Sequence, residues 1–278
     1  MTESLDEDLS LAFRLADAAD AISLARFRAL DLVIETKPDL TPVSDADRAV
    51  EESLRRTLAR ERPDDAVLGE EFGTTGESAR RWILDPIDGT KNYVRGVPVW
   101  ATLIALASDG GDSPADAPTD NIALGMVSAP ALGMRWWASD GGGAWAGSQR
   151  SGARRLSTSR VSSVVDSSVS FSDWNDPAWE AAGHRSGFES LLKLAWRTRA
   201  YGDFWSHLLV AEGAVDVAIE PQLNAWDMAA LIPIVREAGG RITALDGSPA
   251  MTGGNALSTN GQVHDQVLAL LAADEPEA

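Results

Sequence analysis

Two aspartates, Asp85 and Asp88, directly follow an apolar run in the stretch WILDPIDGTKN. The run Trp-Ile-Leu is typical of a buried strand, and a buried carboxylate costs several kcal/mol unless it is paired or coordinated. The nearest basic residue, Lys91, cannot neutralise both aspartates together with the glutamate pair Glu70 and Glu71. A divalent metal ion is therefore the partner that these residue types favour, because such ions take oxygen ligands.

The residues around the two aspartates also suit a negatively charged ligand. The backbone carbonyl of Ile87 offers one more oxygen to a metal ion. Gly89 lets a ligand approach the backbone, and the N–H groups of Gly89 and Thr90 can face an anion. Two metal ions set several ångströms apart can clamp a phosphoryl oxygen and activate water. The stretch therefore predicts a site for a phosphate monoester, even in an acidic protein.

Each acid also has an ordinary structural explanation. Asp47 stands three residues after Ser44 at a predicted helix start, a capping-box pattern that on its own favours capping over metal binding. Asp227 fits the first turn of another helix, where an acid complements the helix dipole. The remaining acids fit turns, solvated or built around Pro86: Glu70, Glu71, Asp85 and Asp88.

Mixed strands and helices are predicted to position these residues. Helices are predicted at 5–29, from Ser44 to Pro63, at 204–212, 226–238 and 263–272. Strands are predicted at 66–68, 81–85, 99–107, 122–128, 134–138, 164–171, 215–219 and 241–244. We expect a mobile hairpin loop at 108–121 and a glycine-rich turn at 139–150. Without a strict βαβ repeat, this mixture favours layered α/β or α+β packing.

Composition narrows the class of protein. The 278 residues are 44% hydrophobic, enough for one large domain or two close subdomains. The net charge of −18 argues against nucleic acid or an anionic membrane as partner. The absence of cysteine excludes disulfides and thiolate metal sites, and three histidines make zinc a poor expectation. With no signal peptide or long apolar stretch, the sequence predicts a cytoplasmic protein.

Three short segments resemble the signatures of the inositol monophosphatase family, in the same order. They are GEE at 69–71, WILDPIDGTKNYVRG at 82–96 and WDMAA at 226–230. KPDLTPVSDAD, at 37–47, resembles the upstream family segment that ends in a metal-binding aspartate. The resemblance spans nearly the whole chain. It implies an α+β fold, a layered αβαβα sandwich of the sugar-phosphatase type, as one catalytic domain over 1–278 with subdomains at about 5–150 and 151–273.

The resemblance implies a magnesium-dependent, lithium-sensitive phosphomonoesterase, a homodimer, that uses two or three metal ions. The first ion would be held by Glu70, Asp85 and the Ile87 carbonyl. The second would be held by Asp85, Asp88 and Asp227, and a third, weaker ion is assigned through water to Asp47. Thr90 with Glu70 would orient and deprotonate the attacking water. The phosphate would contact Asp88, Gly89 and Thr90, and Lys37 matches a lysine near the third ion and the substrate.

The leaving group is predicted from the second half of the chain. Inositol-specific members of the family usually carry Gly-Ser or Gly-Thr where this chain has Gly202-Asp203. With Glu220, Asp203 would put two carboxylates beside the leaving group, where a cationic alcohol gains charge-assisted hydrogen bonds. L-histidinol phosphate fits, and NYVRGVPVWATLIAL with the Gly-Asp pair resembles the histidinol-phosphatase branch, which serves histidine biosynthesis. Asp203 equally fits the N-cap of a helix beginning near Phe204.

Other functions stay open on the sequence alone. The nearest alternative is an inositol-1-monophosphatase or a broad sugar-phosphate phosphatase, with fructose-1,6-bisphosphatase activity as a side possibility. A nucleotide 3'-phosphatase is disfavoured because no clear basic pocket for a second phosphate is found. A non-catalytic regulator that binds metal or phosphate is the alternative from another class. Glu70 and Thr90 argue against it, because a binding module needs no residues that activate water.

Overall fold

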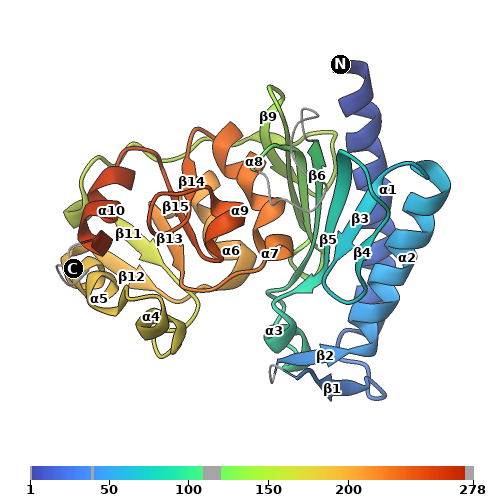
Figure 1. The fold of residues 1–278 in the computed structure, drawn as a ribbon, viewed down its shortest axis with the longest axis horizontal. Coiled ribbons are helices and arrows are strands. Elements are labelled where there is room, and N and C mark those ends of the chain that lie inside the picture. Colours follow the sequence, from blue (N-terminus) through green and yellow to red (C-terminus); the bar gives the residue numbers. More distant parts are fainter. Residues whose placement is uncertain (1, 39–40, 109–119, 273–278) are drawn as a thin grey trace.

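Helices and sheets alternate in layers through the molecule (Figure 1). The computed structural model describes residues 2–38, 41–108 and 120–272. In Figure 1, helices α1 and α2 cover the outer face of one sheet, α6, α7 and α8 lie between the two sheets, and α5 and α10 cover the outer face of the second. The predicted α+β sandwich with αβαβα layers is confirmed. These layer helices are α1 Thr2–Arg26, α2 Asp45–Glu61, α5 Arg185–Leu194, α6 Asp203–Ala211, α7 Ala225–Ala229, α8 Leu231–Glu237 and α10 His264–Ala272.

The larger sheet is mostly antiparallel. Among the described residues its strand order is β10-β9-β8-β7-β6-β5-β3-β4. Of the strand pairs described in this sheet, only β3 and β5 run parallel, with Gly69 of β3 opposite Leu84 of β5. The strands are β3 Ala66–Gly69, β4 Gly73–Thr75, β5 Arg80–Asp88, β6 Ala101–Ser108, β7 Ile122–Ala129, β8 Met134–Ser139, β9 Gly143–Gly147 and β10 Arg154–Arg155.

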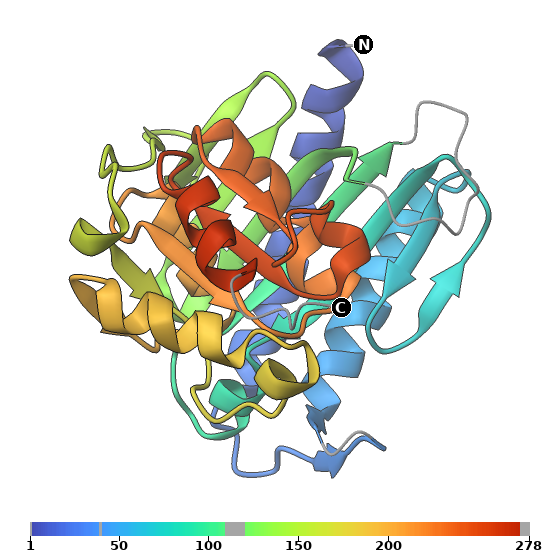
Figure 2. The same cartoon turned by 60° about the vertical axis from the view of Figure 1, so that its left-hand side comes forward.

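The smaller sheet has the order β12-β11-β13-β15-β14 within the described residues. Its first three strands are parallel to one another, and β15 runs antiparallel to both β13 and β14. Figure 2 brings this half forward, with its red and yellow-orange helices on the outer side. The strands are β11 Ser168–Ser170, β12 Arg197–Arg199, β13 Val217–Glu220, β14 Arg241–Thr243 and β15 Ala256–Thr259.

Short elements complete the described chain. Strands β1 Ile34–Thr36 and β2 Pro42–Ser44 form an antiparallel pair ahead of α2. The other short elements are α3 Thr90–Val94, α4 Ala178–Ala181, α9 Ala250–Gly253 and the 3-10 turns η1 Pro130–Leu132 and η2 Val164–Asp166. Within residues 2–38, 41–108 and 120–272, every helix is too short or too polar to span a bilayer.

The hydrophobic patterns explain how the layers pack. On α2 the residues Val50, Leu54 and Leu58 recur every four positions and are all buried, as the periodicity predicts. They pack with α1 and with Leu84 of β5 on one face of the larger sheet. The other face packs against α6, α7 and α8. The larger sheet is therefore buried on both faces, so a carboxylate on one of its central strands has little access to water.

Two predicted helix boundaries are wrong. The first helix ends at Arg26 rather than at residue 29, because Arg28 adopts a positive φ of 62° and its guanidinium donates to the carbonyl of Gly96. The helix predicted at 226–238 is divided at Ala230 into α7 and α8. Pro233 lacks the N–H that would bond to the carbonyl four residues earlier, so the helical ladder is interrupted there.

Two predicted segments in other regions also differ. The segment predicted as a strand at 164–171 begins with the 3-10 turn η2, and within this described segment only β11 pairs as a strand. The glycine-rich turn predicted at 139–150 contains β9, in which Ala144 and Ala146 are buried. Alternating burial there was obscured by the number of glycines. Most of the hairpin loop predicted at 108–121 lies outside the described residues.

Candidate active site

The parallel pairing of β3 with β5 brings two of the predicted acids together. Gly69 lies opposite Leu84, so Glu70, which follows the end of β3, lies beside Asp85 of β5. The backbone N–H of Glu70 donates to the carbonyl of Leu84 at 3.2 Å. Because the carboxyl ends of parallel strands share one edge, this edge is the natural place for a ligand.

A β-bulge turns Asp85 and Asp88 toward the same side. Asp85 pairs with Leu103 and Asp88 pairs with Ala101, so β5 advances by three residues over the distance in which β6 advances by two. Residues three apart on a regular strand point to opposite faces, and one extra residue restores the same face. The expectation that the strand ends at Asp85 is therefore wrong. The strand continues to Asp88, and the sharp turn comes at Gly89, whose φ is +78°.

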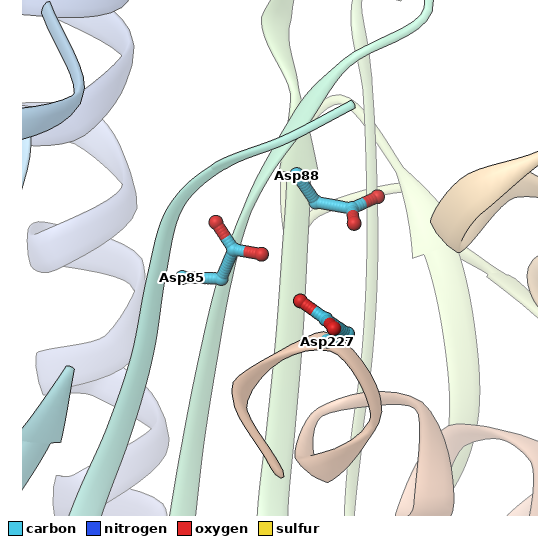
Figure 3. A group of neighbouring side chains, drawn as sticks. All are labelled: Asp85, Asp88 and Asp227. Carbon is cyan, nitrogen blue, oxygen red and sulfur yellow. The ribbon is translucent and has the colours of Figure 1, made fainter. Parts of the chain in front are cut away.

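Three carboxylates converge at this edge (Figure 3). Asp85 and Asp88 extend from β5, and Asp227 points toward them from α7. One oxygen of each lies within 4.8 Å of the others, a spacing that one metal ion can bridge. Asp85 is buried, and its Oδ1 has no hydrogen-bond partner among the described residues. The arrangement lacks positive charge and could hold a metal ion.

The pKa values of the three acids also favour a cation at this site. Burial and the neighbouring carboxylates raise the pKa of Asp85 and of Asp88 well above the ordinary value. Burial is also the main cause that raises the pKa of Asp227 to about 7. Crowded acids resist ionisation because like charges repel in a poorly solvated site. A bound cation would reverse this effect, since it favours the ionised form of each ligand.

Two of the predicted acids also start helices. Asp47 completes a capping box on α2, where its Oδ2 accepts from the Ser44 backbone N–H at 2.8 Å. Asp227 does the same on α7, with its Oδ2 accepting from the Asn224 N–H at 2.7 Å. The capping interpretation of Asp47 and the first-turn position of Asp227 are thus confirmed. In each case one carboxylate oxygen remains for another partner.

Thr90 sits between the bulge and α2. Its hydroxyl donates to the carbonyl of Ile87 at 2.9 Å and lies 3.4 Å from Oδ1 of Asp47. Gly89, just before it, has no room for a side chain, because a Cβ atom would lie 3.1 Å from the carbonyl oxygen of Val99 and 3.2 Å from Oδ2 of Asp203. The backbone of this turn therefore approaches its neighbours as closely as a glycine allows.

Lys37 lies on the outer side of the same cluster. Its Nζ is 2.7 Å from Oε1 of Glu70 and 2.6 Å from Oε1 of Glu71. The two carboxylates raise the pKa of the lysine against the effect of its burial. Lys37 was predicted near a third ion and the substrate, and its contacts place it beside the glutamate pair. No sequence signal linked the lysine to these residues.

Asp203 and Glu220 stand at the ends of the smaller sheet's strands. Asp203 follows β12, and its Oδ2 accepts from the side-chain amide of Asn92 at 3.2 Å. Glu220 ends β13, and its Oε1 accepts from the Ser172 hydroxyl at 2.7 Å. The same hydroxyl accepts from the backbone N–H of Asp203 at 2.9 Å. One serine therefore connects the two acids.

The capping explanation of Asp203 is wrong. The N-cap of α6 is Gly202, and Asp203 is the first helical residue, with an unusual positive φ of 48°. Burial raises the pKa of Asp203, while Lys91 lowers it. Burial also raises the pKa of Glu220 to about 8, with Asp203 adding repulsion. A positive φ at a non-glycine residue is a strained conformation that functional sites retain.

Besides the bond from Asn92 to Asp203, a second hydrogen bond links the two halves of the site. The backbone N–H of Phe204, in the first turn of α6, donates to Oδ2 of Asp88 at 2.9 Å. Sequence reasoning missed this contact, and it also missed Ser172 and Asn92. These are neutral groups or backbone atoms with no distinctive pattern, so only the three-dimensional arrangement identifies them.

Comparison with known proteins identifies relatives over the full length of the chain. Residues 4–275 match the model of the inositol monophosphatase family. The histidinol-phosphatase of Streptomyces coelicolor is 55% identical over 98% of both chains. The histidinol-phosphatase of Mycobacterium tuberculosis is 56% identical over 96% of this chain and 98% of its own. The structure of an inositol monophosphatase from Anabaena has a TM-score of 0.80 and 26% identity, with 98% of each chain covered.

Proposed function

The chain belongs to the inositol monophosphatase family, and we propose that it hydrolyses L-histidinol phosphate to L-histidinol and phosphate in histidine biosynthesis. The observation that carries this proposal is identity of 55% and 56%, over nearly the whole length, to two histidinol-phosphatases. The same relatives and the family make the protein a phosphoric monoester hydrolase. A cytoplasmic homodimer, as the resemblance implies, is part of the proposal.

We assign the metal ions to the acids at the end of β5. Asp85, Asp88 and Asp227 fit a hard divalent cation, because they supply only oxygen atoms and a buried oxygen of Asp85 has no donor within the described part of the chain. Glu70 and the Ile87 carbonyl would complete a first Mg²⁺ site with Asp85. A third, weaker ion would rest on Asp47. When bound, Mg²⁺ offsets the charge of the phosphate oxygens and lowers the pKa of water.

The remaining residues of the turn would handle water and phosphate. Thr90 would orient the attacking water through its hydroxyl, and Glu70 would accept the proton. The hydroxyl of Thr90 is already held by the Ile87 carbonyl and Asp47, so its direction is set before substrate arrives. The backbone N–H groups of Gly89 and Thr90, with Asp88, would face the phosphate.

The leaving group would lie against the ends of β12 and β13. Asp203 and Glu220 are two acids whose pKa values are raised by burial, and a cationic ligand would favour the ionised form of each. L-Histidinol brings an ammonium and an imidazole, and each can donate a charge-assisted hydrogen bond to a carboxylate. A neutral polyol offers no such charge.

An inositol or sugar-phosphate phosphatase is the second candidate. The full-length structural similarity to the Anabaena inositol monophosphatase supports it, because both would share the same chemistry at the metal ions. The acid at position 203 favours the cationic substrate over it.

A substrate comparison tests the proposal. With Mg²⁺ in excess, purified protein is assayed for phosphate release from L-histidinol phosphate, inositol 1-phosphate and fructose 1,6-bisphosphate. We expect kcat/KM to be far higher for L-histidinol phosphate. A higher kcat/KM for either of the other two substrates would contradict the assignment of L-histidinol phosphate as substrate, but it would still agree with hydrolase activity. No release from any of the three with Mg²⁺ or Mn²⁺ would reject the hydrolase itself.

A further inference from the structure

A buried glutamate supports the segment that carries Glu70. Glu51, on α2, is fully buried, and its Oε2 accepts the backbone N–H of Glu71 at 2.7 Å. Its Oε1 accepts the N–H of Phe72 at 3.2 Å and pairs with Nε of Arg55 at 2.7 Å. Both carboxylate oxygens thus bind the two residues that directly follow Glu70.

The neighbouring glycine is shaped to the same carboxylate. A Cβ atom at Gly69 would lie 2.1 Å from Oε1 of Glu51, far inside contact distance. Glycine is therefore needed at position 69 because a side chain would collide with Glu51, and not because the backbone has a positive φ there. The glycine of the GEE segment and a glutamate eighteen positions earlier form one steric unit.

Arg55 extends the contact to the far side of the turn. Its guanidinium donates to the carbonyl of Gly73 and, at 2.8 Å, to the hydroxyl of Thr75 in β4. Glu51 and Arg55 together bind four positions of the β3–β4 hairpin, two in its loop and two in β4: Glu71, Phe72, Gly73 and Thr75. The hairpin that presents Glu70 is consequently anchored to a single turn of α2.

From these contacts we propose that Glu51 is a positioning residue for the metal site, acting through the backbone on either side of Glu70. On one side, the N–H of Glu70 bonds to Leu84 of β5, and on the other the N–H of Glu71 bonds to Glu51. The backbone of Glu70 is therefore restrained at both ends, and Oε1 of its side chain pairs with Lys37. The inference rests on the proposed use of Glu70 as a metal ligand. Substituting a residue that orients a metal ligand commonly lowers metal affinity by about 10–100-fold.

The substitution Glu51→Gln tests the role with little change in volume. A glutamine NH₂ cannot accept the N–H that a carboxylate oxygen accepts, so at least one contact to Glu71, Phe72 or Arg55 is lost. We expect the Mg²⁺ concentration for half-maximal activity to rise at least about tenfold, with kcat at saturating Mg²⁺ within about threefold of wild type. Calorimetric titration with Mn²⁺, in the absence of any substrate, should show the same loss of affinity.

Asp8→Asn is the matched control. Asp8 is also fully buried and is paired with two arginines, Arg62 and Arg80, at 3.0 Å each, yet it contacts neither Glu70 nor its neighbours in the described structure. We expect it to lower the melting temperature as Glu51→Gln does and to leave the Mg²⁺ requirement unchanged. Equal melting losses with an unchanged Mg²⁺ requirement and Mn²⁺ affinity in both variants would overturn the proposal.

A double-mutant cycle keeps the test decisive if Glu51→Gln unfolds. Gly69→Ala alone should weaken Mn²⁺ binding at least about tenfold, because its methyl group displaces the Glu51 carboxylate. In the Glu51→Ala background the same methyl has room, so the double variant should bind Mn²⁺ no more weakly than Glu51→Ala alone. If the double variant lost Mn²⁺ affinity by the product of the two single losses, Gly69 and Glu51 would act independently and the proposal would be contradicted. Because Mn²⁺ binding needs no substrate, the result stands even if the proposed substrate is wrong.

Discussion

Both sheets direct the carboxyl ends of parallel strands toward the site, but the acids at those ends have different surroundings. Both present the carboxyl ends of parallel strands, which is where open sheets bind their ligands. In the larger sheet, β3 and β5 lead to Glu70 and Asp85. In the smaller sheet, β11, β12 and β13 lead to Ser172, Asp203 and Glu220.

The difference lies in what surrounds each acid. At the larger sheet the carboxylates face one another, and a buried oxygen of Asp85 has no donor among the described residues. At the smaller sheet the amide of Asn92 and the hydroxyl of Ser172 hold the acids individually. A bound ion would favour the ionised form of the first group, whereas each acid of the second group already has a side-chain hydrogen-bond donor. We infer that the larger sheet supplies the reaction and the smaller sheet selects the substrate.

The substitution Asp88→Asn tests whether the larger sheet supplies the reaction, and we expect it to give the largest loss of activity. The asparagine oxygen can still accept from the Phe204 N–H, but the charge at the metal site is lost. We expect turnover to fall roughly a thousandfold or more. The loss should be the same for L-histidinol phosphate and for inositol 1-phosphate. Phosphate release near the wild-type rate would mean that Asp88 is not a metal ligand.

Part of the pH dependence of stability should come from His207, and His264, whose burial also lowers its pKa to about 4, contributes in the same direction. His207 is buried on α6, and burial lowers its pKa to about 4 from an ordinary 6.5. The unfolded chain therefore takes up a proton first as the pH falls, so stability present above pH 6.5 is lost between 6.5 and about 4.

This loss amounts to about 3 kcal/mol of unfolding free energy. Denaturant unfolding at pH 7 and pH 4.5 should show a flatter profile for His207→Gln, in Mg²⁺ and in EDTA alike. Equal pH dependence in the variant and the wild type would exclude His207 as a cause.

Asp203→Asn should separate the substrates. A charge-assisted hydrogen bond to a cationic leaving group is lost, so kcat/KM for L-histidinol phosphate should fall about 10–100-fold. The value for inositol 1-phosphate should change less than about threefold. Glu212→Gln, just beyond the opposite end of α6, is the control, because Glu212 pairs with Arg154 and Trp136 far along the helix from Asp203. Equal losses for both substrates in Asp203→Asn would make Asp203 structural.

Ser172→Ala is expected to give the smallest effect. Its hydroxyl joins the backbone N–H of Asp203 to the side chain of Glu220, and a typical intramolecular hydrogen bond contributes about 0.5–1.5 kcal/mol. The preference for L-histidinol phosphate should therefore narrow by about threefold to tenfold. Ser167→Ala, just before β11, is the control for removing a hydroxyl near that strand. An unchanged preference in Ser172→Ala would show that the serine does not tune the acids.

Local patterns predicted much of the fold and most of the acids. The four-residue spacing of Val50, Leu54 and Leu58 gave the buried face of α2, and the Ser44–Asp47 spacing gave its cap. The apolar run before Asp85 indicated a buried carboxylate. These signals act within one turn of helix or a few residues of strand, where sequence spacing and spatial proximity coincide.

Long-range features escaped prediction. The parallel pairing of β3 with β5 and the bulge in β5 depend on which strands meet, which periodicity does not encode. The positive φ of Asp203, 48°, is a backbone conformation that its residue type alone does not predict. A weak signal for Glu51 was present, since it is a charged residue adjoining the buried face of α2.

The paired capping boxes of Asp47 and Asp227 have a consequence for how such a protein can diverge. Each aspartate stands at the third position of its helix, where it accepts the backbone N–H of the N-cap residue, and each is also proposed for the metal site. The amide oxygen of an asparagine can accept the same N–H. Aspartate and asparagine codons differ by a single base, so one mutation at either position would remove the negative charge and spare the fold. A folded descendant that no longer hydrolyses phosphate esters is therefore one nucleotide away.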